Sequence, residues 1–146
     1  MTIPTHLMLG AIIGKVTGNY IVGFTSSVFP DLDHLQSYYT HDILLKPKKL
    51  WNALTDTKDN FGDQRGIFHN VIFFAIVCFL SIIFFHKIGI IIAIGWLGHL
   101  CLDALDNSDY WPFYPNKSIN LRGPIKYASF QELIFFILLM LLYFVI

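Results

Sequence analysis

The sequence places three side chains that can bind a metal at one end of a predicted helical hairpin. Two apolar runs joined at His86-Lys87 are predicted to form antiparallel helices, with His69 before the first run and His99 and Asp103 after the second. At about 1.5 Å per residue, the three side chains return to about the same level. His99 and Asp103 are four residues apart and share a helix face. Imidazole and carboxylate groups that converge in this way are typical of a metal site.

A shorter pair of apolar segments near the N-terminus repeats this arrangement. His6 lies about 12 residues before a break at Gly18-Asn19, and Asp31 lies about 13 residues after Gly18. If both arms are helical, His6 meets Asp31 and its neighbours at the same end as the first group. The candidate metal ligands are therefore His6, Asp31, Asp33, His34, His69, His99 and Asp103.

This set of side chains predicts a bound transition metal. Imidazole and carboxylate together suit Zn²⁺, with Mn²⁺ or Fe²⁺ as alternatives, better than Ca²⁺. Seven such groups exceed the needs of one tetrahedral site, so we expect one or two ions. Ionisable groups next to apolar, membrane-type segments are costly, which makes them functional candidates.

Four residues are candidates for catalytic roles beside the metal. Asp33, if it is not a ligand, is a candidate general base. Arg65 and Arg122 could hold an anionic group as charge develops, or could equally be positively charged membrane anchors. Glu132 could support the site or act as a base, although an acidic residue also suits a first helical turn.

Four other ionisable residues are predicted to lie outside the site. His41 falls in a polar segment and His86 at the remote turn of the hairpin. Asp106 and Asp109 are predicted to be solvated loop charges.

Composition indicates an integral membrane protein. The 146 residues suffice for one domain spanning 1–146, and 55% are hydrophobic. Only 14% are charged, against about 25% in a typical soluble chain. The net charge of zero gives no electrostatic case for binding nucleic acid. We expect no secretory signal peptide at the N-terminus, and no disulfide between Cys78 and Cys101.

The predicted fold is an all-α membrane bundle of about five helices, consisting of two antiparallel hairpins and a C-terminal helix. The expected helices cover about 5–16, 20–29, 71–85, 88–103 and 127–146. Polar loops are expected at about 35–64 and 107–126, with a short amphipathic helix around 48–54. The arms of the first hairpin are too short to cross a bilayer of about 30 Å alone.

Basic residues predict the orientation in the membrane. Most of them fall in the segments on the side of the predicted site, namely Lys46, Lys48, Lys49, Lys58, Arg65, Lys117, Arg122 and Lys126. The opposite side has only Lys15 and Lys87. By the positive-inside rule, the site and the N-terminus face the cytoplasm of a multi-pass protein.

The ordered motifs resemble those of the bacterial inner-membrane metal-dependent hydrolases, the YdjM-like group. The matching motifs are Thr5-His6 followed by Gly10, Pro30-Asp31-Leu32-Asp33-His34, Arg65-Gly66 leading to His69, His99-Leu100 with Leu102-Asp103, and a proline-rich aromatic loop ending at Pro115. The resemblance implies a helical inner-membrane protein with a metal-hydrolase activity. In chemistry alone, the site is also similar to that of helical zinc-dependent phospholipases C.

The chain departs from this family pattern at three positions. Gln64 stands where the family commonly has His, and Asn70 and Gly98 stand where it commonly has Ser. The change at Gln64 removes an imidazole that a second metal could use.

These observations favour a membrane-bound hydrolase acting on a lipid or lipid-linked phosphoester or ester. The expected partners are membrane lipid and an anionic, lipid-like substrate, because the site lies at headgroup depth. One alternative is a metal transporter, whose ligands should lie near the bilayer midplane along a path. The other is a non-catalytic membrane protein with a relict or structural metal site.

Overall fold

The computed structural model describes residues 1–54 and 64–146, and this part of the chain is helical apart from its loops. The helices are α1 (Ile3–Thr17), α2 (Tyr20–Val28), α3 (Leu32–Thr40), α4 (Pro47–Leu54), α5 (Val71–Phe85), α6 (Lys87–Leu105) and α7 (Phe130–Val145). Two short 3-10 helices, η1 (Phe29–Asp31) and η2 (Ile67–His69), precede α3 and α5. Among these residues no strand forms, and only two isolated bridges connect the loop segments after α6.

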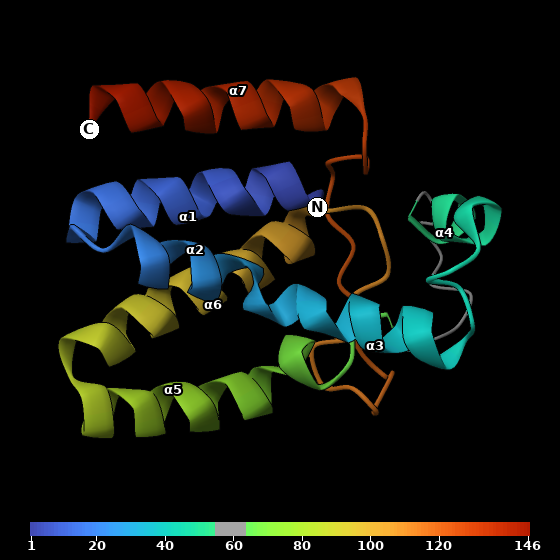
Figure 1. The fold of residues 1–146 in the computed structure, drawn as a ribbon, viewed down its shortest axis with the longest axis horizontal. Coiled ribbons are helices and arrows are strands. Elements are labelled where there is room, and N and C mark those ends of the chain that lie inside the picture. The colour runs from blue at the N-terminus through green and yellow to red at the C-terminus, as the bar shows by residue number, and fades with distance from the viewer. Residues whose placement is uncertain (55–63) are drawn as a thin grey trace.

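Both predicted hairpins are present. Helix α1 packs on α2, α5 packs on α6, and α2 packs on α6 to join the two hairpins. Helix α7 packs along α1 (Figure 1). Gly18, at φ 73°, ends α1, and the side chain of Asn19 caps α2 by accepting from the N–H of Val22.

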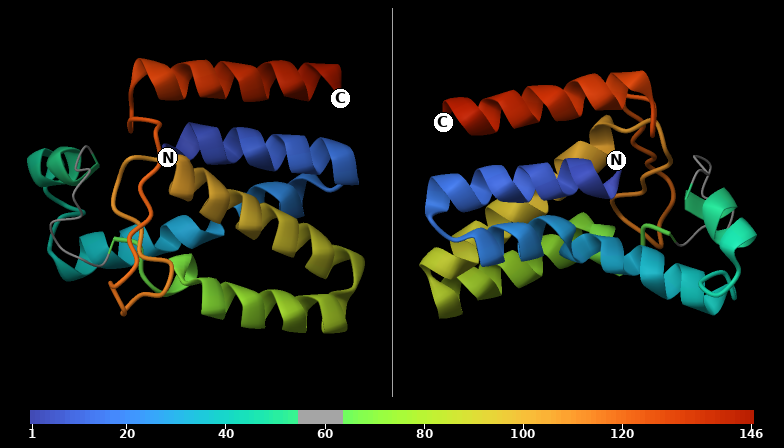
Figure 2. Two further views of the ribbon diagram at one scale, coloured as in Figure 1. Left: turned by 180° about the vertical axis from the view of Figure 1, so that it is seen from behind. Right: turned by 45° about the horizontal axis from the view of Figure 1, so that its top comes forward.

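The polar segments gather at one end of the bundle. In Figure 1 the turns of both hairpins and the C-terminus lie at the left, whereas the N-terminus, α3, α4 and the loops after α6 lie at the right. The two further views in Figure 2 show the same division. Each hairpin therefore returns to the end of the bundle at which it began. The candidate ligands gather at this end, as the residue spacing predicts.

Two boundaries differ from the predicted ones. Helix α7 begins at Phe130 rather than near 127, because the Ser129 side chain accepts from the N–H groups of Gln131 and Glu132 and so caps the helix. The segment predicted as a loop from 35 onward continues α3 to Thr40, because Ser37 and Tyr38 are buried although the segment lacks an apolar period. Helix α4 confirms the predicted short helix, and 55–63 lie outside the described residues.

Glycines set the distance between α1 and α2. A Cβ added at Gly23 would lie 2.7 Å from the carbonyl oxygen of Gly10 and 2.8 Å from the nitrogen of Gly14. Small residues that let two helix backbones approach are characteristic of helix pairs in membranes. This close contact fixes the positions of α1, which carries His6, and of α2, which leads directly into η1 and Asp31.

The outer surfaces of the helices are apolar. Among the described residues, α6 is the one helix long and apolar enough to cross a membrane by itself, and α1, α5 and α7 are shorter apolar helices. Large side chains such as Phe79 and Phe84 on α5 and Leu138 and Phe144 on α7 are exposed. Both cysteines are free, which agrees with the expected absence of a disulfide.

Substitution of Gly23 by Ala tests the importance of the α1–α2 contact. The new methyl group would press on backbone atoms of α1, which cannot move without shifting the helix, so we expect a loss of about 1–3 kcal/mol of stability. The measurement is the thermal unfolding midpoint of purified protein in detergent.

Gly98→Ala is the matched control for this substitution. Its Cβ would meet Cδ2 of Leu9, the end of a flexible side chain that can move aside. Equal losses in the two variants would contradict the backbone-contact account.

Candidate metal centre

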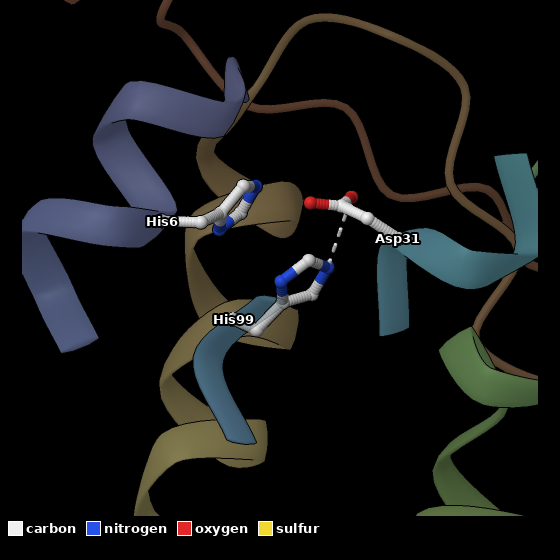
Figure 3. Close-up of side chains that lie close together, drawn as sticks. All are labelled: His6, Asp31 and His99. Carbon is white, nitrogen blue, oxygen red and sulfur yellow. Dashed lines mark ion pairs between the residues drawn. The ribbon is translucent and has the colours of Figure 1, made fainter. Parts of the chain in front are cut away.

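Different elements supply the candidate ligands, and all of them reach the same end of the bundle. Helix α1 supplies His6, η1 ends at Asp31, and α6 carries His99 in its C-terminal half. Figure 3 shows these three side chains pointing toward one another from their separate elements. His99 Nε2 lies 3.7 Å from Asp31 Oδ1, and the rings of His6 and His99 stack with centroids 3.9 Å apart.

Three overlapping groups of side chains could hold a metal ion. The members of each group place ligand atoms within 4.8 Å of one another. The groups are His6, Asp31 and His99, then Asp31, His34 and His69, and finally His69, His99 and Asp103. Because the groups share members, they form one continuous centre, which contains six of the seven predicted ligands. We call these six side chains the metal centre.

The hydrogen bonds of two histidines fix where their protons lie. His99 Nδ1 is 2.8 Å from the carbonyl oxygen of Ser27, and a carbonyl can only accept, so this nitrogen carries a proton. His69 Nδ1 is 2.9 Å from Asp33 Oδ2 and donates to that carboxylate. In the neutral imidazoles, both Nε2 atoms are therefore left with a lone pair.

These two Nε2 atoms face each other at 3.1 Å, deep inside the protein. Two lone pairs at this distance repel unless a proton or a metal ion lies between or beside them. Two imidazole nitrogens bound to one tetrahedral zinc at about 2.0–2.1 Å lie about 3.3 Å apart. Asp103 Oδ2 completes the set at 3.2 Å from His69 Nε2 and 3.8 Å from His99 Nε2. The donor set and its spacing thus fit a divalent metal.

Asp33 lies behind His69 rather than in the centre itself. Its Oδ2 accepts hydrogen bonds from the backbone N–H groups of Phe68 and His69 as well as from the His69 ring. In metal sites, a histidine commonly binds the metal through one ring nitrogen and donates the N–H of the other to a carboxylate, which orients the ring. Asp33 is therefore placed to orient His69, and its predicted role as a ligand stays a prediction.

Arg65 forms ion pairs with two acidic residues at the C-terminal end of α6, one of which, Asp103, belongs to the centre. Its Nε lies 2.8 Å from Asp103 Oδ2, its Nη2 lies 3.6 Å from Asp106 Oδ2, and its Nη1 donates to the carbonyl oxygen of Asp109. The terminal ammonium of Met1 also contacts both side-chain carboxylates, at 2.6 Å from Asp103 and 2.8 Å from Asp106. These cations offset the cost of burying two negative charges.

The prediction that Asp106 is a solvated loop charge is wrong. Asp106 is 0% exposed and caps the C-terminus of α6, where it binds Arg65 and accepts from Ser108. Its position three residues after Asp103, on the same helix face, is the signal that could have identified it. Asp109 is partly buried and accepts from Arg122 and Asn120.

Glu132 and Arg122 lie outside the three groups. Glu132 is buried and accepts from the N–H and hydroxyl of Thr2, the hydroxyl of Thr5 and the N–H of Ala128, so it fastens the start of α7 to the start of α1. Arg122 is half exposed and pairs with Asp109. Their catalytic roles stay predictions.

The two remaining histidines also lie elsewhere. His41 ends α3 and His86 forms the turn between α5 and α6. Neither belongs to the groups found among the described residues.

Burial favours the neutral form of two members of the centre. It raises the pKa of the Asp31 carboxyl and lowers the pKa of the His34 imidazole well below its usual value. Neutral imidazole is the form that binds a metal, so His34 is ready to act as a ligand at neutral pH.

A cavity of about 490 Å³ lies beside the centre. Asp31, His34 and Arg65 contribute polar groups to its lining, whereas most of the other lining residues are apolar, among them residues of α1, α3 and α4. The centre therefore borders a space that suits an amphiphilic molecule.

Comparison with protein families matches the model described as YdjM inner membrane protein, over residues 1–146. The chain belongs to this family. Comparisons with curated proteins and with solved structures found no match. The resemblance inferred from the motifs is thus confirmed for the YdjM family and for an inner membrane protein.

Two contacts of this YdjM-family chain could not be recognised from its sequence. The partner of His99 is the backbone carbonyl of Ser27, which any residue type would provide. The hydroxyl of Tyr110 donates to the backbone carbonyl oxygen of His69, which any residue type would also provide. Asn70, which departs from the family pattern, caps α5 by accepting from Ile72 and Phe73.

The Asp33→Asn variant tests the support of His69. An amide accepts more weakly than a carboxylate, so His69 becomes a less basic and less firmly oriented ligand. We expect the affinity for Zn²⁺ to fall about 10- to 100-fold, measured by competition with a chelator. Asp42→Asn is the control, because Asp42 is exposed and pairs only with Lys46 among the ion pairs of the described residues. Unchanged zinc affinity in Asp33→Asn would contradict the assignment.

Proposed function

We propose that this YdjM-family protein is a membrane-bound metal-dependent hydrolase that acts on a lipid or lipid-linked phosphoester or ester. The proposed cofactor is Zn²⁺, with Mn²⁺ or Fe²⁺ as alternatives, bound as one or two ions. The observation that carries the proposal is the 3.1 Å approach of His69 Nε2 and His99 Nε2, whose Nδ1 atoms are both committed to acceptors. Such a pair needs a shared proton or a bound metal ion, and the surrounding carboxylates favour a divalent metal.

The proposed ligands are the six side chains of the metal centre, His6, Asp31, His34, His69, His99 and Asp103. When bound, the metal would lower the pKa of a coordinated water and so supply a nucleophile at neutral pH. Asp31 Oδ2 is buried, lacks a hydrogen bond and borders the cavity. It is the carboxylate best placed to accept a proton from water at the mouth of the centre.

Arg65 supports the binding of an anionic group. Arg65 lines the cavity, where it pairs with Asp103 and Asp106. Because its donors already contact three partners, we assign it to holding the carboxylates in place and to attracting a phosphate or ester oxygen by its charge. Asp33 is assigned to orienting His69, since its Oδ2 already accepts three hydrogen bonds.

We further propose that the helices of both hairpins and α7 are embedded in the membrane, with the metal centre at the cytoplasmic side. Support comes from the exposed apolar side chains and from basic residues in the segments next to α4 and between α6 and α7, such as Lys46, Lys117 and Lys126. Figure 1 shows these segments at the end that carries the centre. At the opposite end Lys15 binds the carbonyl oxygen of Tyr143. Arg65 is buried in ion pairs, so it does not count toward the positive-inside rule.

Placement of the ligands bears on the alternative functions. A transporter should hold its ligands near the middle of the membrane, along a path. Here they lie at the end of the bundle that carries the loops, which favours a hydrolase or a structural metal site (Figure 1). Measurement of substrate turnover distinguishes a hydrolase from a structural metal site.

The test is hydrolysis by purified protein reconstituted in liposomes with Zn²⁺, using a panel of phosphoester and carboxylic ester lipids. We expect release of a headgroup or a fatty acid, detected by mass spectrometry, and loss of this activity with a chelator. His99→Ala should lower the rate by about 100-fold or more, because it removes a ligand. The control is His86→Gln at the remote turn, which should keep full activity.

The opposite results are equally informative. Stoichiometric metal that depends on His99, with no turnover of any lipid in the panel, would favour a structural site. Turnover that persists in His99→Ala would overturn the proposed centre.

A further inference from the structure

The cavity beside the metal centre has an apolar mouth. Ile3, Leu32 and Leu35 line it and are 53%, 42% and 52% exposed. We call these three side chains the mouth. Leu32 and Leu35 each directly follow a residue of the centre in the sequence, Asp31 and His34, and both of these also line the cavity. The apolar opening and the metal centre are therefore parts of one space.

A second part of the cavity lining, at α3 and α4, includes buried side chains. Tyr38 and Ala53 line it and are almost fully buried, in a cluster with Ile43 against which Leu44 and Leu50 pack. These residues come from α3, α4 and the segment between them. We call Tyr38, Leu44, Leu50 and Ala53 the closed end. A molecule that reaches it leaves water completely, which favours a hydrocarbon over a polar group.

We propose that the cavity holds a single hydrocarbon chain of the substrate, which enters sideways from the membrane through the mouth while its ester group stays at the metal centre. This inference rests on the proposed function and specifies its substrate as a lipid bound by one chain. An exposed apolar mouth on a membrane protein admits a chain from lipid more readily than from water, because the chain never has to be hydrated.

The size of the cavity supports one chain. Its volume of about 490 Å³ is in the lower half of the range of about 300–1,000 Å³ that is typical of small-molecule sites. A complete two-chain lipid would have to leave one chain outside, in the membrane next to the mouth.

The chemistry along the cavity supports the same orientation. Asp31, His34 and Arg65 supply polar groups to the lining, as do Asp109 and the charged residue Met1, whose ammonium is paired with Asp103 and Asp106. Most of the remaining lining residues are apolar. A chain that extends from the centre to the closed end therefore meets mainly carbon, and an ester at its head meets the metal ligands.

Photolabelling tests this proposal without requiring turnover. The probe is a dodecylphosphonate with a diazirine at its terminal carbon, added to zinc-loaded protein in lipid nanodiscs. The phosphonate has no ester to hydrolyse, so labelling reports binding alone. We expect cross-links at the closed end, mapped by peptide mass spectrometry. Cross-links confined to the exposed faces of α5 and α7 would overturn the proposal.

Two variant pairs sharpen the result. Ala53→Phe shortens the space and should lower labelling of Leu44 and Leu50 by about tenfold or more, since two displaced methylenes cost about fourfold each. Asn52→Phe, on an exposed position of the same helix, should leave labelling unchanged.

A second pair serves if Ala53→Phe does not fold. Leu35→Asn at the mouth should lower labelling, whereas Gln36→Asn at the exposed neighbouring position should leave it unchanged. Equal labelling within a pair would overturn the proposal.

The failures of the two proposals can be distinguished. Cross-links at the closed end without hydrolysis of any lipid would support the chain site and overturn the hydrolase. Zinc-dependent hydrolysis of a soluble short-chain ester, without cross-links at the closed end, would support the hydrolase and overturn the chain site.

Discussion

The structure depends on one constraint, the meeting of two imidazole nitrogens that each present a lone pair. His69 and His99 give their Nδ1 protons to Asp33 and to the carbonyl of Ser27, so their Nε2 atoms have no proton to offer each other at 3.1 Å. A proton on one of the two nitrogens or a bound metal ion relieves this repulsion. The two rings come from separate elements, η2 and α6, and the packing of α5 on α6 holds those elements side by side. The hairpin therefore holds the two nitrogens close together within groups that could bind a metal ion.

The surrounding charges balance this centre. Asp103 contributes a negative charge deep in the protein and is held by Arg65, by His6 Nε2 at 3.3 Å and by the ammonium of Met1. A buried carboxylate without such partners would cost several kcal/mol. On the other side, α1 and α2 approach closely at their glycines and bring His6 and Asp31 to the same level. The fold thus places charged groups at one end of an otherwise apolar bundle, next to a cavity lined mainly by apolar residues.

Much of this arrangement follows from the sequence, because helix rise converts residue spacing into position. The spacing of His69, His99 and Asp103 around one turn predicted their meeting, and the break at Gly18 did the same for the first hairpin. Contacts to backbone atoms, such as that of His99 with the carbonyl oxygen of Ser27, cannot be recognised from residue types. The burial of Asp106 and the extension of α3 to Thr40 depend on tertiary contacts that overrule local polarity. The hydrogen bond from the His69 ring to Asp33 could not be recognised from the sequence, because it depends on side-chain geometry.

X-ray absorption at the zinc edge, on purified protein loaded with Zn²⁺, tests the central claim most directly. If His69 and His99 share a metal, the spectrum will contain at least two imidazole ligands at about 2.0–2.1 Å together with carboxylate oxygen. The multiple-scattering signal of imidazole should weaken in His69→Ala. A zinc environment of oxygen atoms alone, or a spectrum identical in wild type and His69→Ala, would contradict the account. The facing nitrogens would then be held by a shared proton rather than a metal.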